Sequence, residues 1–243
     1  MTAAVECRDL RKTYDGKVEA VRGLSLLIEP GECFGLLGPN GAGKTTTIEI
    51  LEGLLEPTSG EVSILGRSWK THSRELREDI GISLQETRLS EKLTVRETIE
   101  LFASFYTQPR STHEVLSALQ LNEKSEALVG NLSGGQKQRL AVATALVASP
   151  RVLFLDEPTT GLDPITAAAI NALIIEQVRR LGCTAVSITH DLASARTIGD
   201  EIVLLNAGRI VWRGGPDELD TTDDPRVRQF VDGRADGPLT RPG

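Results

Sequence analysis

The chain has 243 residues, of which 40% are hydrophobic and 25% charged, and its net charge is −7 at pH 7. This composition is that of a globular protein, and no apolar run reaches the ~20 residues that a membrane-spanning helix needs. The acidic balance argues against a broad nucleic-acid surface, so we expect no nucleic acid among its partners. The opening residues lack the apolar stretch of a signal peptide, which predicts a cytoplasmic protein.

Residues 1–66 contain short β-rich runs, broken by Pro30 and Gly31. The run "CFGLLG" predicts a buried strand, and "KTTTIEILEGLL" predicts a helix. Between them "GPNGAGKTT", residues 38–46, satisfies the pattern G-x-x-x-x-G-K-[ST]. A strand followed by this loop and a helix is the context in which the pattern binds phosphates.

Each part of this loop has a chemical task. The glycines let backbone N–H groups wrap the phosphates, Lys44 can reach the β- and γ-phosphates, and the Thr45 hydroxyl can bind Mg²⁺. We therefore expect ATP and Mg²⁺ as ligands. The predicted nucleotide-binding residues of the loop are Gly38, Pro39, Asn40, Gly41, Ala42, Gly43, Lys44, Thr45 and Thr46. Tyr14, in "KTYDG", could stack on adenine or simply cover the edge of a sheet, and both interpretations stay open.

The next region, from about residue 87 to 148, predicts a mostly helical subdomain. Apolar residues recur at helical spacing in "TVRETIELFASFY", "STHEVLSALQL" and "SGGQKQRLAVATALVAS". Thr94 and Glu97 form a T-x-x-E capping box at the first of these helices. Gln85, in "GISLQE", follows a short β-like run just before this region, and a glutamine there has no functional meaning by itself.

A second anion-binding pattern lies within the helical region, in "NLSGGQKQRL", residues 131–140. A serine and two glycines before a helix suit an anion, because free N–H groups and the positive end of the helix dipole face it. The chain already has a phosphate-binding loop, so this second pattern requires its own explanation.

After Pro150 strands and helices alternate again, which predicts a largely parallel sheet. The runs "RVLFLDE" and "TAVSITH" predict buried strands, with the helical "PITAAAINALIIEQVRRLG" between them. The run "EIVLLNAGRIVWRG" predicts a hairpin turning at residues 206–208. The segment from Pro216 is acidic and then rich in Gly and Pro, so we expect it to be peripheral.

Polar residues follow two of these strands. Asp156 would hold Mg²⁺, and Glu157 could polarise an attacking water as a general base. A D-E pair by itself is more often a cap or a solvated turn, but the phosphate-binding loop upstream favours the functional interpretation. His190 ends "TAVSITH", where it could reach the γ-phosphate, although an isolated histidine at a strand end is usually structural.

Taken in order, these motifs resemble the nucleotide-binding domain of an ABC ATPase over nearly the whole chain, to about residue 215. "LSGGQ" is similar to that family's signature and is the most specific of them. The resemblance implies an α/β P-loop NTPase fold of the ABC type. Its parts would be a mainly parallel core sheet, an antiparallel β subdomain and an inserted helical subdomain. It also implies an ATPase domain over residues 1–220 and a C-terminal tail over residues 221–243.

The resemblance also explains the second anion-binding pattern. In the family two such domains pair head to tail, and each ATP lies between one phosphate-binding loop and the other domain's signature. By resemblance, Gln85 senses Mg²⁺ and the attacking water, His190 senses the γ-phosphate, and Asp163 in "GLDP" lines the dimer interface. The signature residues that would face the neighbour's nucleotide are Ser133, Gly134, Gly135 and Gln136. The expected catalytic residues are then Glu157, His190 and Gln85, and the expected Mg²⁺ ligands are Thr45, Gln85 and Asp156.

Within the family, a compact helical segment and a single cassette favour transport over work on nucleic acid or ribosomes, which stays the alternative. We therefore expect an ATPase subunit on the inner face of the cell membrane. Its partners would be an integral-membrane permease, docked near "ETRLSEKLTVRETIELFASFY", and a second copy or a homologous ATPase subunit. The N-terminal half resembles ABC-2-type exporters of drugs, lipids or polysaccharides, whereas "THDLASARTIGDEIVLLNAGRIVWRG" resembles ATPases of Mce-associated phospholipid transport.

Overall fold

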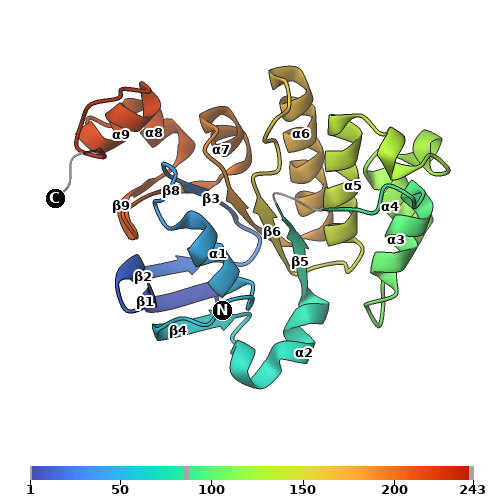
Figure 1. The fold of residues 1–243 in the computed structure, drawn as a ribbon, viewed down its shortest axis with the longest axis horizontal. Coiled ribbons are helices and arrows are strands. Elements are labelled where there is room, and N and C mark those ends of the chain that lie inside the picture. Colours follow the sequence, from blue (N-terminus) through green and yellow to red (C-terminus); the bar gives the residue numbers. More distant parts are fainter. Residues whose placement is uncertain (1, 85–87, 241–243) are drawn as a thin grey trace. The chain divides into compact units, whose positions relative to one another are not determined.

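The computed structural model describes residues 2–84 and 88–240. The chain divides into two compact units. Unit 1 comprises Met1–Thr71 and Ser187–Gly243, and unit 2 comprises His72–Val186. Figure 1 labels the helices and strands of both units.

The helices and strands cover most of the described residues. In chain order they are β1 (Val5–Tyr14), β2 (Val18–Ile28), β3 (Cys33–Leu37), α1 (Lys44–Leu51), β4 (Ser59–Ile64), α2 (Trp69–Asp79), β5 (Ile80–Ser83), α3 (Val95–Ala103), α4 (Thr112–Ala118), α5 (Gly134–Leu146), β6 (Val152–Asp156), α6 (Pro164–Leu181), β7 (Thr184–Ile188), α7 (Leu192–Ile198), β8 (Glu201–Asn206), β9 (Arg209–Gly214), α8 (Pro216–Thr221) and α9 (Pro225–Val231). Within residues 2–84 and 88–240, no helix combines the length and the apolar character needed to cross a membrane.

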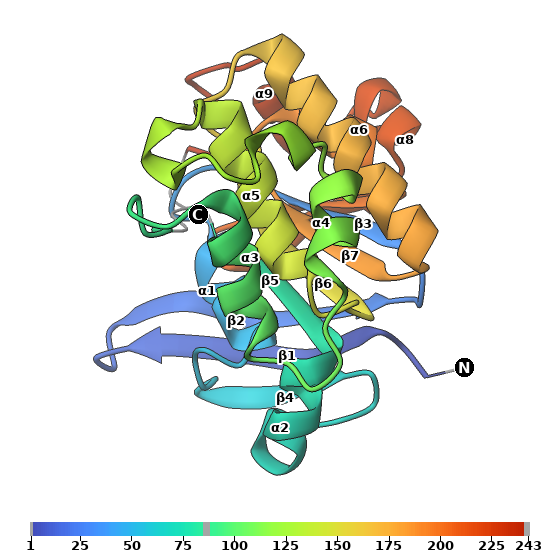
Figure 2. The same ribbon diagram turned by 90° about the vertical axis from the view of Figure 1, so that its right-hand side faces the viewer.

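Unit 1 contains the antiparallel sheet that the resemblance implies. β1 lies between β2 and β4 and pairs antiparallel with both, and Figure 2 shows the three strands side by side. Val5 pairs with Ile28 on one side and with Ile64 on the other, and all three side chains are fully buried. Cross-strand apolar groups of this kind fix the register, because a slip by one residue would turn them towards water.

The other strands of unit 1 carry the phosphate-binding loop. β3 is buried along its whole length and pairs parallel with β8. β8 turns into β9 at Ala207 and Gly208, whose φ angles of 46° and 76° are those that a two-residue hairpin turn of this type needs. The predicted hairpin is therefore confirmed, and the phosphate-binding loop begins where β3 ends.

Unit 2 contains the predicted helical subdomain. β5 and β6 pair in parallel, and α5 packs against β5, α3 and α6. The predicted capping box is confirmed: the N–H of Glu97 donates to Thr94 Oγ1 at 3.1 Å, and the N–H of Thr94 donates to Glu97 Oε2 at 2.8 Å. Ser111 and Glu114 cap α4 in the same way. β7 crosses the boundary between the two units.

The C-terminal segment, expected to be peripheral, is anchored to unit 1 at two positions. It folds into α8 and α9, which bury Leu219 and Val227 completely in a cluster with Leu37, Ala195 and Leu204. Two apolar side chains anchor an otherwise acidic segment, most of whose other residues are exposed or partly buried. The division of the chain at residue 220 stays a prediction.

Candidate nucleotide-binding and hydrolysis site

The loop between β3 and α1 has a backbone that only glycine accommodates. Gly38, Gly41 and Gly43 have φ angles of 155°, 77° and 98°. A Cβ on Gly38 would lie 2.3 Å from the carbonyl oxygen of Leu205, and one on Gly43 would lie 2.3 Å from that of Ala20. The glycines of the motif therefore satisfy both backbone conformation and close packing.

Lys44 begins α1 and is only 7% exposed. Its Nζ donates to the carbonyl oxygens of Gly38 at 2.7 Å and Pro39 at 3.2 Å. No side chain caps α1, whose N-cap is Gly43. The first N–H groups of a helix have no intrahelical partners, so the loop presents N–H donors and an ammonium group at one place.

Gly208 supports this loop from the β8–β9 turn. Its N–H donates to the carbonyl oxygen of Ala42 at 2.8 Å, and its own carbonyl oxygen accepts the N–H of Arg22 at 2.8 Å. A Cβ at this position would lie 2.7 Å from the carbonyl oxygen of Ala20. The sequence places Gly208 in the predicted hairpin turn, but its contact with the loop joins distant parts of the chain and could not be predicted from spacing.

Tyr14 is the last residue of β1 and lies beside α1. The residue is 37% exposed, and its hydroxyl lies 3.4 Å from Thr46 Oγ1. Lys12 Nζ lies 5.4 Å from the ring centroid. The tyrosine is thus neither buried nor isolated, and its hydroxyl lies next to α1.

His190 also belongs to unit 1 and is exposed just after β7. The next residue, Asp191, caps α7 by accepting the N–H groups of Ala193 and Ser194 at 3.1 and 3.0 Å. Partial burial raises the pKa of Asp191, but hydrogen bonds from Ser194 and Ala193, with the nearby His190, lower it below its ordinary value. The cap therefore fixes the backbone next to His190.

Asp156 and Glu157 stand at the end of β6 in unit 2. They are 7% and 8% exposed. Glu157 has a φ of 50°, which is costly for a residue with a side chain, and its Oε2 accepts a hydrogen bond from Thr160 Oγ1 at 3.0 Å. Strained backbone of this kind concentrates at functional sites. Thr160 was not found from the sequence, although it lies only three positions beyond Glu157.

The signature residues form the start of α5. Ser133 and Gln136 form a capping box, in which the N–H of Gln136 donates to Ser133 Oγ at 3.3 Å and the N–H of Ser133 donates to Gln136 Oε1 at 3.0 Å. The N–H groups of Gly134 and Gly135 lie outside this box. A Cβ on Gly135 would lie 2.6 Å from Thr166 Cγ2 of α6, so glycine lets the two helix starts approach closely.

Asp163 caps α6. It accepts the N–H groups of Ile165 and Thr166, each at 3.0 Å, and the hydroxyl of Thr166. These hydrogen bonds, that of the Thr166 hydroxyl first, lower the pKa of Asp163 below its ordinary value. The carboxylate is therefore charged and held by the helix that it begins.

The predicted residues are divided between the two units. Tyr14, the loop at residues 38–46 and His190 belong to unit 1. Asp156, Glu157, Asp163 and the signature at residues 132–136 belong to unit 2. Gln85 lies outside the described residues.

Comparisons with known proteins agree with these features. Residues 21–160 match the ABC transporter family. Nod factor export ATP-binding protein I of Burkholderia orbicola is 39% identical over 225 residues, covering 89% of this chain and 72% of the relative. The protein of the same name from Rhizobium sp. (strain N33) is 39% identical over 224 residues, with the same two coverages.

Solved structures agree as well. That of cbiO1 from Clostridium perfringens, part of the transporter complex cbiONQ, is 29% identical with a TM-score of 0.82, covering 97% of this chain and 96% of the other. The dimeric ATP-binding cassette MJ0796 bound to ADP and Pi is 31% identical with a TM-score of 0.78, covering 87% of this chain and 98% of the other. The predicted fold class is thereby confirmed. The chain belongs to the ABC transporter family, and it is an ATP-binding, ATP-hydrolysing subunit of a transporter.

Proposed function

We propose that this chain binds ATP with its phosphates in the loop between β3 and α1 and its adenine against Tyr14. The glycine backbone, the uncapped start of α1 and the buried Lys44 support this assignment. The Lys44 ammonium would exchange its carbonyl partners, Gly38 and Pro39, for the β- and γ-phosphates. The Tyr14 hydroxyl lies beside Thr46 Oγ1 of α1, so the ring is held next to the helix that follows the loop.

The side chains present fit a magnesium ion. Thr45 and Asp156 offer a hydroxyl and a carboxylate, the hard oxygen donors that Mg²⁺ prefers. In the part of the chain that the structure describes, no group of three or more His, Cys, Asp or Glu could hold a metal. Mg²⁺ usually takes several of its ligands from substrate phosphates and water. When bound, Mg²⁺ neutralises charge on the β- and γ-phosphates, and Gln85 is the third protein ligand that we propose.

Glu157 is the proposed general base for hydrolysis. Its carboxylate is mostly buried, and the Thr160 hydroxyl holds it in place. A carboxylate held at the end of β6 can accept a proton from an attacking water. His190 would donate to the γ-phosphate, and Asp191 holds its backbone from the start of α7.

A second copy of the chain, or a homologous ATPase subunit, completes each site in this proposal. The N–H groups of Gly134 and Gly135, with the positive end of α5, would face the γ-phosphate bound by the partner. Asp163 begins α6, close to the start of α5, and would lie at the interface. The dimeric form of the similar cassette MJ0796 supports this arrangement.

We further propose that the subunit docks on an integral-membrane permease at the inner face of the cell membrane. The helical subdomain exposes large apolar side chains: Phe105 is 66% exposed, and Leu101 is 45% exposed. Phe105 packs edge-on against Phe102, with 5.9 Å between the ring centroids. By contrast, Val95 and Ile99 of the same segment are buried and belong to its core.

The direction of transport that we propose is export. The observation that supports it is the similarity to Nod factor export ATP-binding proteins over 89% of this chain, which extends beyond the N-terminal half. The cargo would then be a drug, a lipid or a polysaccharide. Mce-associated phospholipid transport is the alternative, suggested by the C-terminal sequence.

The experiment that tests this function uses Glu157→Gln, purified from native membranes with ATP and Mg²⁺. Loss of the base should trap an ATP-bound dimer on its permease, and wild type without ATP is the control. Recovery of a multi-span permease alone supports export. A permease with a periplasmic lipid-binding protein supports the Mce-associated alternative. Recovery of ribosomes or nucleic acid without a membrane protein contradicts the transport function.

A further inference from the structure

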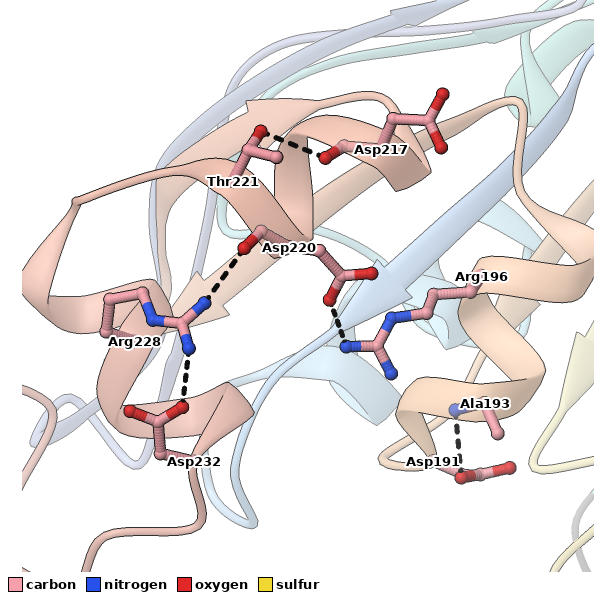
Figure 3. A network of polar contacts seen from close by, with 8 residues as sticks. All are labelled: Asp191, Ala193, Arg196, Asp217, Asp220, Thr221, Arg228 and Asp232. Carbon is pink, nitrogen blue, oxygen red and sulfur yellow. Dashed lines mark hydrogen bonds and ion pairs between the residues drawn. The ribbon is translucent and has the colours of Figure 1, made fainter.

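A chain of polar contacts joins the C-terminal helices to α7 (Figure 3). Arg196 on α7 donates a hydrogen bond from Nη2 to Asp220 Oδ1 on α8. The backbone carbonyl oxygen of Asp220 accepts Nη1 of Arg228 on α9 at 3.1 Å, and Arg228 Nη2 donates to Asp232 Oδ1 at 2.7 Å. The position of α7 is therefore linked to both α8 and α9.

Apolar packing joins the same elements. Leu219 of α8 and Val227 of α9 are fully buried, in one cluster with Ala195 of α7 and Leu37 of β3. Leu37 is the last residue of β3, directly before the phosphate-binding loop. The C-terminal helices thus pack against the two elements of unit 1 that lead to the proposed γ-phosphate contacts.

His190 lies just before the N-terminal end of α7. Asp191 caps this helix, and the N–H of Asp191 donates to Thr189 Oγ1 at 2.9 Å. The N–H of Thr189 donates to the carbonyl oxygen of Leu36 at 3.3 Å, which ties this corner to β3. Because α7 is only seven residues long, a change at Arg196 reaches the cap within two turns.

We propose that α8 and α9 position His190 for hydrolysis, with Arg196 and Asp220 as positioning residues. This inference rests on the proposed contact between His190 and the γ-phosphate. The Arg196 and Asp220 side chains are 32% and 50% exposed, and ion pairs this exposed contribute little to stability. In this proposal the pair instead fixes the orientation of α7.

The first test observes His190 directly by NMR of the imidazole groups. The chain has three histidines, and the other two, His72 and His113, belong to unit 2. In Asp220→Ala the His190 signals should shift or broaden, while those of His72 and His113 stay unchanged. Asp217→Ala is the matched control, because only the backbone carbonyl of Asp217 enters the network (Figure 3). An unchanged His190 signal in Asp220→Ala would overturn the inference.

The second test is kinetic. Asp220→Ala should lower kcat about threefold, the scale expected for a partly exposed pair, with KM for ATP unchanged. The charge-reversed double variant Arg196→Asp with Asp220→Arg should restore most of the rate. A change confined to KM, or an equal loss in Asp217→Ala, would contradict a positioning role. If Asp220→Ala does not fold, Asp220→Asn removes the charge while keeping the side-chain shape.

His190→Ala separates the two proposals. If its kcat equals that of wild type, the contact between His190 and the γ-phosphate is wrong. The NMR measurement on Asp220→Ala, made without nucleotide, still shows whether α8 controls the orientation of His190.

Discussion

Lys44 is a buried cation that two backbone carbonyl groups hold in place at the start of α1. Charge-assisted hydrogen bonds contribute about 1.5–3 kcal/mol each. Lys44→Ala should therefore weaken ATP binding by roughly tenfold to a hundredfold, as measured by isothermal titration calorimetry. Lys70→Ala, on an exposed part of α2, is the control. Unchanged affinity in Lys44→Ala would contradict the assignment of the loop.

A second residue makes the stability of the protein depend on pH. The guanidinium group of Arg226, by hydrogen bonding, holds the pKa of Asp224 at about 2, below its ordinary value of 3.8. A lowered pKa stabilises the fold at pH values above 3.8, and this stabilisation is lost as the pH falls from about 4 to about 2. Asparagine also caps helices well, so Asp224→Asn removes the charge but keeps the cap of α9.

The variant should be less stable than wild type near neutral pH, and the difference should shrink below about pH 4. Urea unfolding at a series of pH values measures the difference in free energy of unfolding between the variant and wild type. Asp223→Asn, on the neighbouring residue, corrects for the loss of one negative charge. A difference that is the same at both ends of the series would show that the ion pair does not contribute.

At the scale of elements, the β8–β9 turn holds the phosphate-binding loop through Gly208. In Gly208→Ala a left-handed backbone costs about 1 kcal/mol, and the new methyl group also meets the carbonyl oxygen of Ala20. The loop must shift, so KM for ATP should rise. Gly182→Ala is the matched control, because its φ is 62° and the space around its Cβ is open. Gly182→Ala should lose a similar amount of stability without a change in KM for ATP. Equal KM values for the two variants would show that Gly208 does not support ATP binding.

The buried strands and the long helix could be predicted from the sequence, whereas the short helices could not. β3 and β6 have only five residues each, but both are fully buried and end at a recognisable motif. Helix α6 has 18 residues, enough to show the helical period. Helices α7, α8 and α9 have seven, six and seven residues, too few for a reliable apolar pattern. Their signals were local: Asp224 followed by Pro225 is an N-cap followed by the proline that suits a first helical position.

The candidate site shows the same limit. The loop at residues 38–46 and the pair Asp156 and Glu157 lie within contiguous motifs, so their chemistry could be predicted together. The contributions of Thr160 and Gly208 come from contacts made after folding, which no spacing reveals. The individual roles of Tyr14, Asp163 and the other predicted residues stay predictions.

At the scale of the whole molecule, the proposal that each site needs two chains can be tested by mixing variants. Lys44→Ala disables the phosphate-binding loop, and Ser133→Arg disrupts the capped start of α5. In a dimer of either variant alone, no site joins an intact loop to an intact signature. A mixed dimer has one such site, formed by the loop of the Ser133→Arg chain and the signature of the Lys44→Ala chain. A one-to-one mixture should therefore hydrolyse ATP when neither variant does. A mixture no more active than its components would contradict head-to-tail pairing.

The partly exposed ring of Tyr14 has a consequence for the choice of nucleotide. Stacking on an aromatic face is available to every base, since each base has a π-face. In our proposal the phosphate-binding loop and the capped start of α5 contact phosphates, which ATP and GTP share. We therefore expect little discrimination between purines by this protein. The relative abundance of the two triphosphates in the cell, rather than a contact with the base, then determines which of them powers transport.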